Sequence, residues 1–303
     1  MIEGPTRVAL RGMPSVWASY PFVVLRKRSP ADEAGALPEL VAAVTGVRID
    51  RTRLERYARV CGFATREAGV LTYPHVLAMP LHLHIFAMPQ FRLRPIGLIH
   101  LSNDIELLGP ADALVSAPLD IEVGARNFRR DDLGVRFDVT TEIRANGRSL
   151  WRENCEFLSR YSKRVESAGR PPRPPKAPRD ARVLGEYALE LRTAWDYARV
   201  SADFNPIHLS DRMARRLGLR GAIMHGLWSL ARSVAAEPAC HPVRGLRLDT
   251  QFLSPVQLPA RVMLKEWQEP GVTRRALCDA RTGRVHMYAG LHAPASVDDR
   301  GAT

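Results

Sequence analysis

Residues 197–208 read Tyr-Ala-Arg-Val-Ser-Ala-Asp-Phe-Asn-Pro-Ile-His, and residues 224–226 read Met-His-Gly. Asn205 followed by Pro206 predicts a helix start, because asparagine caps a helix through its side-chain oxygen and proline suits the first helical position. A second helix is expected to begin near Gly226, directly after a histidine. The segment is therefore expected to be a loop that leads into a pair of helices.

The helices around this segment have recognisable ends in the sequence. The helix after the Asn-Pro cap is expected to run to about Leu217, where Gly218 stops it. Thr193 is the expected cap of a short helix that begins at Ala194. The helix from Gly226 carries apolar residues three and four positions apart, which predicts one buried face. That face is expected to contain Leu227, Leu230, Ala231 and Val234.

Strand-like segments follow these helices, with turn residues rather than further helices between them. They are expected at residues 246–253, 260–267, 273–280 and 284–292. A set of strands that follows its helices, instead of alternating with them, favours the α+β class with an antiparallel sheet. We expect that sheet to wrap around the longer helix.

The chain contains an internal repeat. Tyr57–Phe63 parallels Tyr197–Phe204 at an offset of 140 residues, and Leu101–Val115 parallels Leu248–Val262 at an offset of 147. A duplication of this kind sets the architecture of the whole chain. The first half is expected to have helices at 53–60 and 74–86, followed by strands at 97–108, 113–124, 133–144 and 149–160.

A proline-rich stretch separates the two halves. Ser167–Asp180 holds five prolines among arginines and a lysine, a composition that favours extended polyproline conformation. We predict an N-terminal half at 1–165, a linker at 166–182 and a C-terminal half at 183–303. The alternative is a proline-rich ligand for an SH3-like partner, although the repeat already accounts for a spacer at this place.

The segment from Ser201 to His208, together with His225-Gly226, resembles the signature of the MaoC-like dehydratase family. Members typically read Ser-Gly-Asp-x-Asn-Pro-Ile-His, with His-Gly at the start of the central helix, and Ala202 departs from this pattern. The resemblance implies a double hot dog, which is two hot-dog folds in one chain with antiparallel sheets wrapping central helices. It also implies reversible addition of water to a trans-2-enoyl thioester such as enoyl-CoA, which gives the R-3-hydroxyacyl thioester.

Hydration of a conjugated thioester requires a base, an acid and donors for the charge that develops on the carbonyl oxygen. Asp203 and His208 are the candidate catalytic residues, because a carboxylate and a neutral imidazole both accept a proton from water near pH 7. Gly226 is the candidate oxyanion donor, since the first amides of a helix lack internal partners. The structural alternatives are an ordinary Asp-x-Asn-Pro turn and a glycine that only allows close packing.

Three further residues are predicted to line the substrate site: Ser201, Asn205 and His225. Asn205 is interpreted as a helix cap rather than as a reactant. The first half has Cys61-Gly62-Phe63 at the place of Asp203 and lacks Asn-Pro-Ile-His. It is therefore predicted to be a degenerate, noncatalytic half that completes a pseudo-dimer and provides space for an acyl tail.

Two other functions stay open at this point. A hot-dog thioesterase would need a carboxylate on the central helix to activate water at the thioester carbon, and residues 226–235 contain none. A noncatalytic acyl-CoA-binding subunit would have no need for both Asp203 and His208. A dehydratase is therefore the preferred interpretation.

The charge of the chain bears on its partners. The formal net charge is +12, and all but four of the 44 basic residues are arginines. Such an excess favours phosphate-bearing partners, which include nucleic acid and coenzyme A. The arginines are scattered, without a basic helix, an aromatic RNA-binding pattern or a zinc finger, so we expect no specific nucleic-acid binding. The expected partner is an acyl-CoA or acyl-carrier-protein thioester.

No metal or cofactor is predicted, apart from coenzyme A as part of the substrate. His82 and His84 form a His-x-His pair, but no third ligand at a fitting spacing accompanies it. These two histidines are interpreted as lining of a helix or cleft. The four cysteines are widely spaced and form no Cys-x-x-Cys, so they are expected to be reduced and structural.

An apolar run from Met13 to Leu25 follows two arginines, as in a secretory signal. Two prolines interrupt it, and Arg26-Lys27-Arg28 stands where small cleavage-site residues would be needed. No apolar stretch offers the roughly 20 residues of a membrane span. We predict a cytoplasmic protein that has no membrane partner and is either a monomeric pseudo-dimer or a homodimer.

Overall fold

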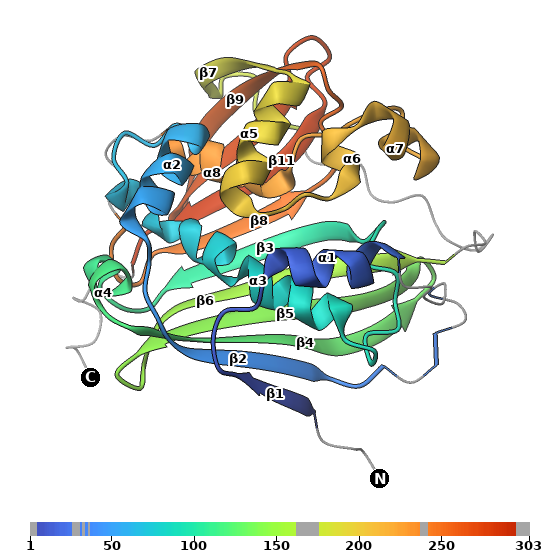
Figure 1. The fold of residues 1–303 in the computed structure, drawn as a ribbon. Coiled ribbons are helices and arrows are strands. Elements are labelled where there is room, and N and C mark those ends of the chain that lie inside the picture. The colour runs from blue at the N-terminus through green and yellow to red at the C-terminus, as the bar shows by residue number, and fades with distance from the viewer. Residues whose placement is uncertain are drawn as a thin grey trace.

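The computed structural model describes residues 5–25, 31, 34–35, 37–161, 176–236 and 242–294. These residues form an 11-stranded sheet with helices packed on one face (Figure 1). The strands of the first half are β1 (Thr6–Leu10), β2 (Leu40–Val47), β3 (Ile99–Leu107), β4 (Leu119–Asp131), β5 (Gly134–Ala145) and β6 (Arg148–Arg160). Those of the second half are β7 (Arg182–Leu189), β8 (Arg247–Phe252), β9 (Ala260–Glu269), β10 (Val272–Asp279) and β11 (Val285–His292).

The order of strands is the same in both halves when each is read from its outer edge. The first half runs β2-β4-β5-β6-β3 and the second runs β7-β9-β10-β11-β8, so that β3 and β8 meet in the middle. They pair antiparallel, with Asn103 opposite Thr250. One continuous sheet therefore spans both halves, where the sequence predicted a sheet for each. Every pairing is antiparallel except β1 with β2, which confirms the predicted α+β class.

The longer helices are α1 (Val16–Leu25), α2 (Arg51–Cys61), α3 (Tyr73–Ala87), α5 (Leu191–Ser201) and α8 (Gly226–Ala235). Short ones are η1 (Glu67–Leu71), α4 (Ala111–Ser116), α6 (Pro206–Leu209) and α7 (Asp211–Arg216). α1 and α3 lie together over the first-half strands, whereas α5 and α8 lie over those of the second half (Figure 1).

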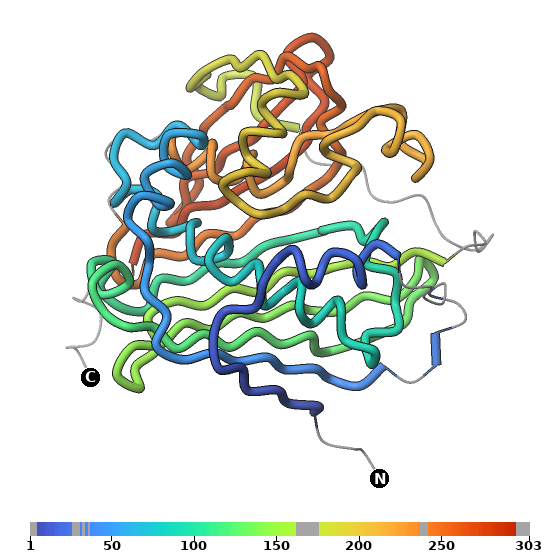
Figure 2. Tube along the Cα trace, viewed as in Figure 1, coloured from blue at the N-terminus to red at the C-terminus, as the bar shows by residue number. Residues whose placement is uncertain are grey.

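Contacts between the helices join the halves. α2 packs on α5 and α8, and the chain trace shows these segments side by side despite their separation in sequence (Figure 2). Tyr57 and Tyr197, which the repeat aligns, face each other with ring centroids 6.3 Å apart. The Trp228 Nε1 group donates a hydrogen bond to the Val60 carbonyl at 3.2 Å. The second half thus takes part of its support from the first.

Local sequence explains why the helices begin and end where they do. Asp50 caps α2 by accepting from the amides of Thr52 and Arg53, and Gly62 ends it in the left-handed region at φ 77°. Asn205 caps α6 by accepting from the Ile207 amide, as the sequence predicted. β5 alternates buried and half-buried residues, so that one face of the sheet lies against the helices.

Three predictions about elements were wrong. The helix expected to reach Leu217 is broken, because Ser210 takes an extended conformation and caps α7 through its hydroxyl. Thr193 is the third residue of α5, where its side chain completes a capping box with Glu190. The strand expected at 113–124 begins only at Leu119, since the residues before it form α4.

Other predictions about elements hold in part. The helix from Gly226 buries Leu230, Ala231 and Val234, but it leaves Leu227 only half-buried and buries Trp228 instead.

No helix within the described ranges is long and apolar enough to cross a membrane. Cys61, Cys155 and Cys278 are free and buried, and Cys240 lies outside the described residues. Most of the predicted linker, residues 166–175, also lies outside them.

Candidate active site

Asp203 stands in the loop between α5 and α6. The residue before it, Ala202, adopts the left-handed conformation at φ 60° and ends α5. The Asp203 Oδ1 atom accepts a hydrogen bond from the Asn205 amide at 3.1 Å, so the carboxylate is held at the start of α6. The Asp203 side chain is 30% exposed, which leaves part of it accessible to a reactant.

His208 lies in the last turn of α6 and has a defined tautomer. Its Nδ1 atom is 2.8 Å from the Ile223 carbonyl oxygen, which only accepts hydrogen bonds, so Nδ1 carries a proton. The Nε2 atom of the neutral ring is then free to accept a proton, and it lies 4.0 Å from Asp203 Oδ2. That distance is too long for a direct hydrogen bond, and both atoms can contact one bound water.

His225 is the third member of this group. Its ring stacks on that of His208, with centroids 3.8 Å apart, and its Nε2 atom donates to the Asp203 backbone carbonyl at 3.1 Å. The same Nε2 atom is 3.9 Å from Asp203 Oδ2. Its Nδ1 atom is buried without a partner among the described residues. His225 therefore contacts both the Asp203 backbone and the His208 side chain.

Burial and mutual charge set the ionisation of the group. Burial lowers the pKa of His208 below its ordinary value, and this outweighs the opposing effects of Asp203 and the Ile223 carbonyl. Burial, reinforced by His208, lowers the pKa of His225 to about 3. Burial alone would raise the pKa of Asp203, but His225, His208 and the Asn205 amide bring it below its ordinary value. At neutral pH the site thus holds a carboxylate and neutral imidazoles.

Gly226 is the first residue of α8, directly after His225. A Cβ atom at this position would lie 3.0 Å from Phe252 Cε1, which is tighter than ordinary side-chain contacts. The His225 side chain makes no capping hydrogen bond. The first amides of a helix have no partner within the helix, so this N-terminus presents N–H groups beside the Asp203 loop.

Ser201 and Asn205 take structural positions. The Ser201 hydroxyl is buried and accepts a hydrogen bond from the Asp203 amide at 3.2 Å, and the Asn205 side chain is used as the cap of α6. The structure brings all six predicted site residues together around one loop. Of these, Asp203 and His208 hold proton-accepting atoms 4.0 Å apart, and Gly226 begins the helix that follows His225.

The sequence did not point to Tyr20 or to the Ile223 carbonyl. The Tyr20 hydroxyl contacts the backbone on both sides of Asp203, and the Ile223 carbonyl fixes the His208 tautomer. Neither residue belongs to the recognised segment, and a backbone carbonyl has no signature in a sequence. An aromatic residue in the apolar run before Arg26 gives no sign of such a contact.

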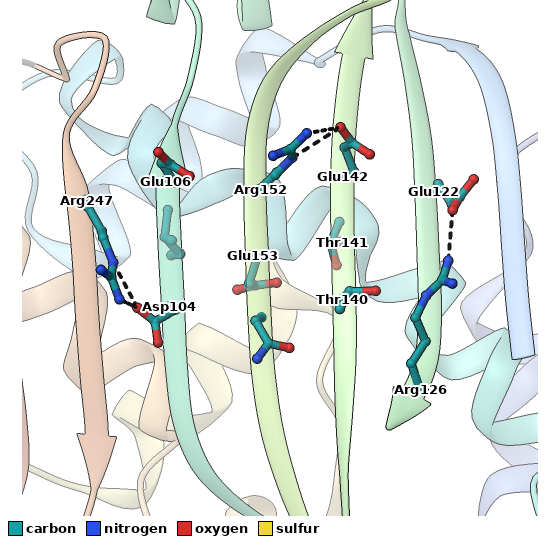
Figure 3. Close-up of a pocket in the computed structure, with 12 residues that line it drawn as sticks. Asp104, Glu106, Glu122, Arg126, Thr140, Thr141, Glu142, Arg152, Glu153 and Arg247 are labelled. Atoms are coloured by element: carbon teal, nitrogen blue, oxygen red, sulfur yellow. Dashed lines mark hydrogen bonds and ion pairs between the residues drawn. The ribbon is translucent and has the colours of Figure 1, made fainter. Parts of the chain in front are cut away.

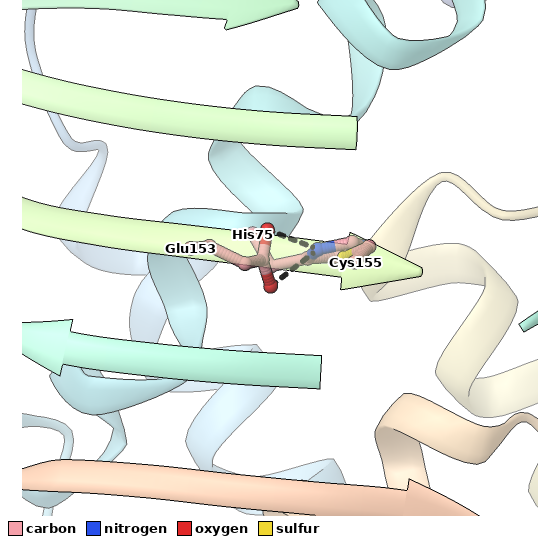
Figure 4. A group of neighbouring side chains, drawn as sticks. All are labelled: His75, Glu153 and Cys155. Carbon is pink, nitrogen blue, oxygen red and sulfur yellow. Dashed lines mark hydrogen bonds and ion pairs between the residues drawn. The ribbon is translucent and has the colours of Figure 1, made fainter. Parts of the chain in front are cut away.

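The first half contains a second buried polar cluster (Figure 4). His75 Nδ1 lies 2.9 and 2.8 Å from the two carboxylate oxygens of Glu153, and Asn103 donates to Glu153 and to Cys155 Sγ. His82 contacts Thr141 at 2.8 Å, so it lines the helix–sheet interface as predicted. Hydrogen bonds already link the members of this cluster.

Two groups of side chains have the composition of metal ligands. His75, Glu153 and Cys155 form one, and Asp203, His208 and His225 form the other, with ligand atoms within 4.8 Å of one another in each. In the first group the Glu153 oxygens accept from His75 and Asn103. In the second the Nδ1 atom of His208 is engaged by Ile223. The absence of a metal remains a prediction.

A hollow of about 600 Å³ lies on the other face of the sheet (Figure 3). Its charged residues are largely paired, as in Arg152 with Glu142, Arg247 with Asp104 and Arg126 with Glu122. Asp104 alternates along β3 with Asn103 and Ile105, which are buried against the helices. The hollow is therefore separated from Asp203 by the sheet.

Comparison with known proteins identifies the domain. Residues 167–286 match the family model described as the MaoC like domain. The 3-hydroxyacyl-thioester dehydratase X of Mycobacterium tuberculosis is 28% identical over 255 residues, which are 84% of this chain and 89% of that protein.

Solved structures agree with the fold. A crystal structure of HtdX from Mycobacterium tuberculosis has a TM-score of 0.70 at 26% identity, and the match covers 83% of this chain and 99% of that one. A second protein of that organism, described as having a double hot-dog fold, has a TM-score of 0.50 at 12% identity and covers 87% and 97%. This chain therefore contains a MaoC-like dehydratase domain and has the double hot-dog fold.

Proposed function

We propose that this chain is an R-specific enoyl-CoA hydratase, which adds water reversibly to a trans-2-enoyl thioester to give the R-3-hydroxyacyl thioester. The reverse reaction is the dehydration of a 3-hydroxyacyl thioester, for which the mycobacterial relative is named. The observation that carries the proposal is the pair of proton acceptors, Asp203 Oδ2 and His208 Nε2, 4.0 Å apart beside the N-terminus of α8.

One water supplies both the hydroxyl group and the hydrogen that are added. The Asp203–His208 pair accepts one proton from the water as its oxygen forms a bond to C3, and the electron pair of the double bond moves toward C2 and the thioester carbonyl. The amide of Gly226 donates to the carbonyl oxygen, where negative charge accumulates. The proton held at the base then passes to C2 on the same face. The reaction consumes one water for each double bond that is hydrated.

A thioesterase is the competing reaction on this fold. It would need a carboxylate placed on the central helix, and α8 contains no acidic residue. A noncatalytic acyl-CoA-binding subunit is the other alternative, and the close approach of Asp203, His208 and His225 argues against it. Burying polar and charged side chains such as these three costs free energy, which is unfavourable unless they serve a function.

The carrier of the acyl group is proposed to be coenzyme A or acyl carrier protein, because both offer phosphate to a chain of net charge +12. The proposed mechanism requires no metal and no redox cofactor, since the thioester supplies the activation of the double bond. A monomeric pseudo-dimer, a homodimer and a cytoplasmic location stay predictions.

The proposed reaction has a direct test with crotonyl-CoA. The purified protein is expected to remove the enone absorbance without releasing free thiol, because water adds to C3 and leaves the thioester intact. Release of coenzyme A at the same rate would instead identify a thioesterase. Binding of crotonyl-CoA without either change would support a noncatalytic subunit. Chiral analysis of the product distinguishes the R alcohol from the S alcohol.

The pH dependence of hydration follows from the ionisation of the site. Its active form has neutral His208 and ionised Asp203, and burial lowers the pKa of His208. The value of kcat/KM should therefore be constant near pH 7 and fall on acidification, with a midpoint below about 6.5, the ordinary pKa of histidine. Initial rates between about pH 5 and pH 8 measure this. A midpoint above that value, or a rate that rises on acidification, would contradict the assignment.

A further inference from the structure

α1 is a helix of the noncatalytic half that touches the catalytic loop. Its residue Tyr20 lies 182 positions before Ala202, yet the Tyr20 hydroxyl is 3.0 Å from the Ala202 carbonyl oxygen. The same hydroxyl is 2.5 Å from the Phe204 backbone nitrogen. The two hydrogen bonds are compatible, because a phenol donates one and accepts another. Tyr20 therefore connects the residues on either side of Asp203.

We propose that Tyr20 is a positioning residue that holds the Asp203 loop in its reactive conformation, so that the first half contributes to the reaction of the second. The inference rests on the proposed hydratase function for its effect on rate. Its geometric part, the hydrogen bonds to Ala202 and Phe204, does not depend on which reaction is catalysed.

The loop needs such support because of Ala202. This residue adopts φ 60° and ψ 15°, the left-handed region in which a Cβ atom is unfavourable and glycine is preferred. An alanine held there requires surrounding contacts that define the conformation. The Tyr20 hydroxyl supplies two such contacts, one with the Ala202 carbonyl and one with the Phe204 amide.

Aromatic contacts place the hydroxyl. The rings of Trp17 and Phe204 lie 4.9 Å apart, and those of Tyr20 and Phe204 meet edge to face at 6.2 Å. Trp17 and Tyr20 are also neighbours at 6.0 Å on α1. α1 itself packs on α3, so Tyr20 is presented by a helix that the first-half sheet supports. Residues of α1 thus contact both the ring and the backbone amide of Phe204.

The charge of the loop suits a neutral phenol. Burial, and then the nearby Asp203 carboxylate, raise the pKa of Tyr20. The hydroxyl accordingly keeps its proton throughout the working range and remains a donor to Ala202. Phenylalanine at this place would retain the ring contacts and lose both hydrogen bonds.

The test replaces Tyr20 by phenylalanine. We expect kcat for crotonyl-CoA hydration to fall about tenfold, because the loss of hydrogen bonds lets Asp203 leave the reactive geometry. KM should change less than about twofold, since no substrate contact is removed. Ser19→Ala is the matched control, because it removes a hydroxyl from the same helix that donates to the Ser15 carbonyl, one residue before α1 begins, and not to the Asp203 loop. It should retain the parental kcat.

Hydrogen exchange gives a readout that is independent of activity. The Phe204 amide should be protected in the parental protein and should exchange faster in Tyr20→Phe, with no such change in Ser19→Ala. Rapid exchange of this amide in the parental protein, or a folded Tyr20→Phe variant with parental kcat, would overturn the proposal. If the parental protein did not hydrate crotonyl-CoA, the proposed function would fail, and the exchange result would still decide whether Tyr20 holds the loop.

A double-mutant cycle with Ala202→Gly tests whether Tyr20 acts by stabilising the left-handed conformation of Ala202. Glycine adopts the left-handed conformation without the cost that alanine carries, so the loop should depend less on Tyr20 in that background. Tyr20→Phe is therefore expected to lower kcat by a smaller factor when combined with Ala202→Gly than it does alone. An equal or larger factor would show that the hydroxyl does not act by stabilising Ala202.

Discussion

Asp203→Asn and His208→Gln should each lower the turnover of enoyl-thioester hydration by a factor on the order of 10² or more, because general acid–base catalysis contributes at least that much. Both residues act on the same water in the proposed mechanism. The double variant is therefore expected to be little worse than either single variant. Single-turnover rates with crotonyl-CoA would measure these effects.

The control for these substitutions is Asp196→Asn, which removes a carboxylate from the half-exposed side chain of α5 that pairs with Arg199. It should keep the parental turnover. Melting temperatures of all variants are compared first, since the Asp203 side chain also accepts from the Asn205 amide. Multiplicative losses in the double variant would show that the residues act on separate steps. Near-parental turnover of either folded single variant would remove its catalytic assignment.

The features that the sequence predicted well depend on neighbouring residues. Asn205 caps its helix by accepting from the amide of Ile207, two positions away, and this local contact explains why Asn-Pro predicts a helix start. The last four strands, β8 to β11, were placed to within a few residues, because turn residues bound them. The approach of Asp203 to His208 follows for the same reason, since His208 is only five positions after Asp203.

Features that depend on distant contacts were missed. β1, β2 and β7 carry weak periodicity, and they become strands through pairing with partners far along the chain, as β2 does with β4. The repeat predicted two similar halves but could not show that Asn103 and Thr250 would pair to make a single sheet. Ser210 was read as a helix residue, whereas its hydroxyl is used to cap α7. Tyr20 contacts a loop 184 residues away.

Gly226→Pro is expected to lower turnover by about 10² to 10³, the usual effect of removing one oxyanion donor. A backbone donor cannot be removed by truncating a side chain, but proline has no amide hydrogen. The local backbone suits proline, because Gly226 is the first residue of α8 and His225 before it is extended at φ −63° and ψ 132°. Pro74 occupies the first turn of α3 in the noncatalytic half.

The matched control is Gly226→Ala, which keeps the amide and adds the Cβ atom that proline also brings. That atom would lie 3.0 Å from Phe252 Cε1, so both variants test the same steric contact, while only proline removes the donor. Circular dichroism and melting establish that each is folded before rates are compared. Equal losses in the two variants would assign the effect to Phe252. If a folded Gly226→Pro protein hydrated crotonyl-CoA at the parental rate, the carbonyl oxygen would have to be bound by another group.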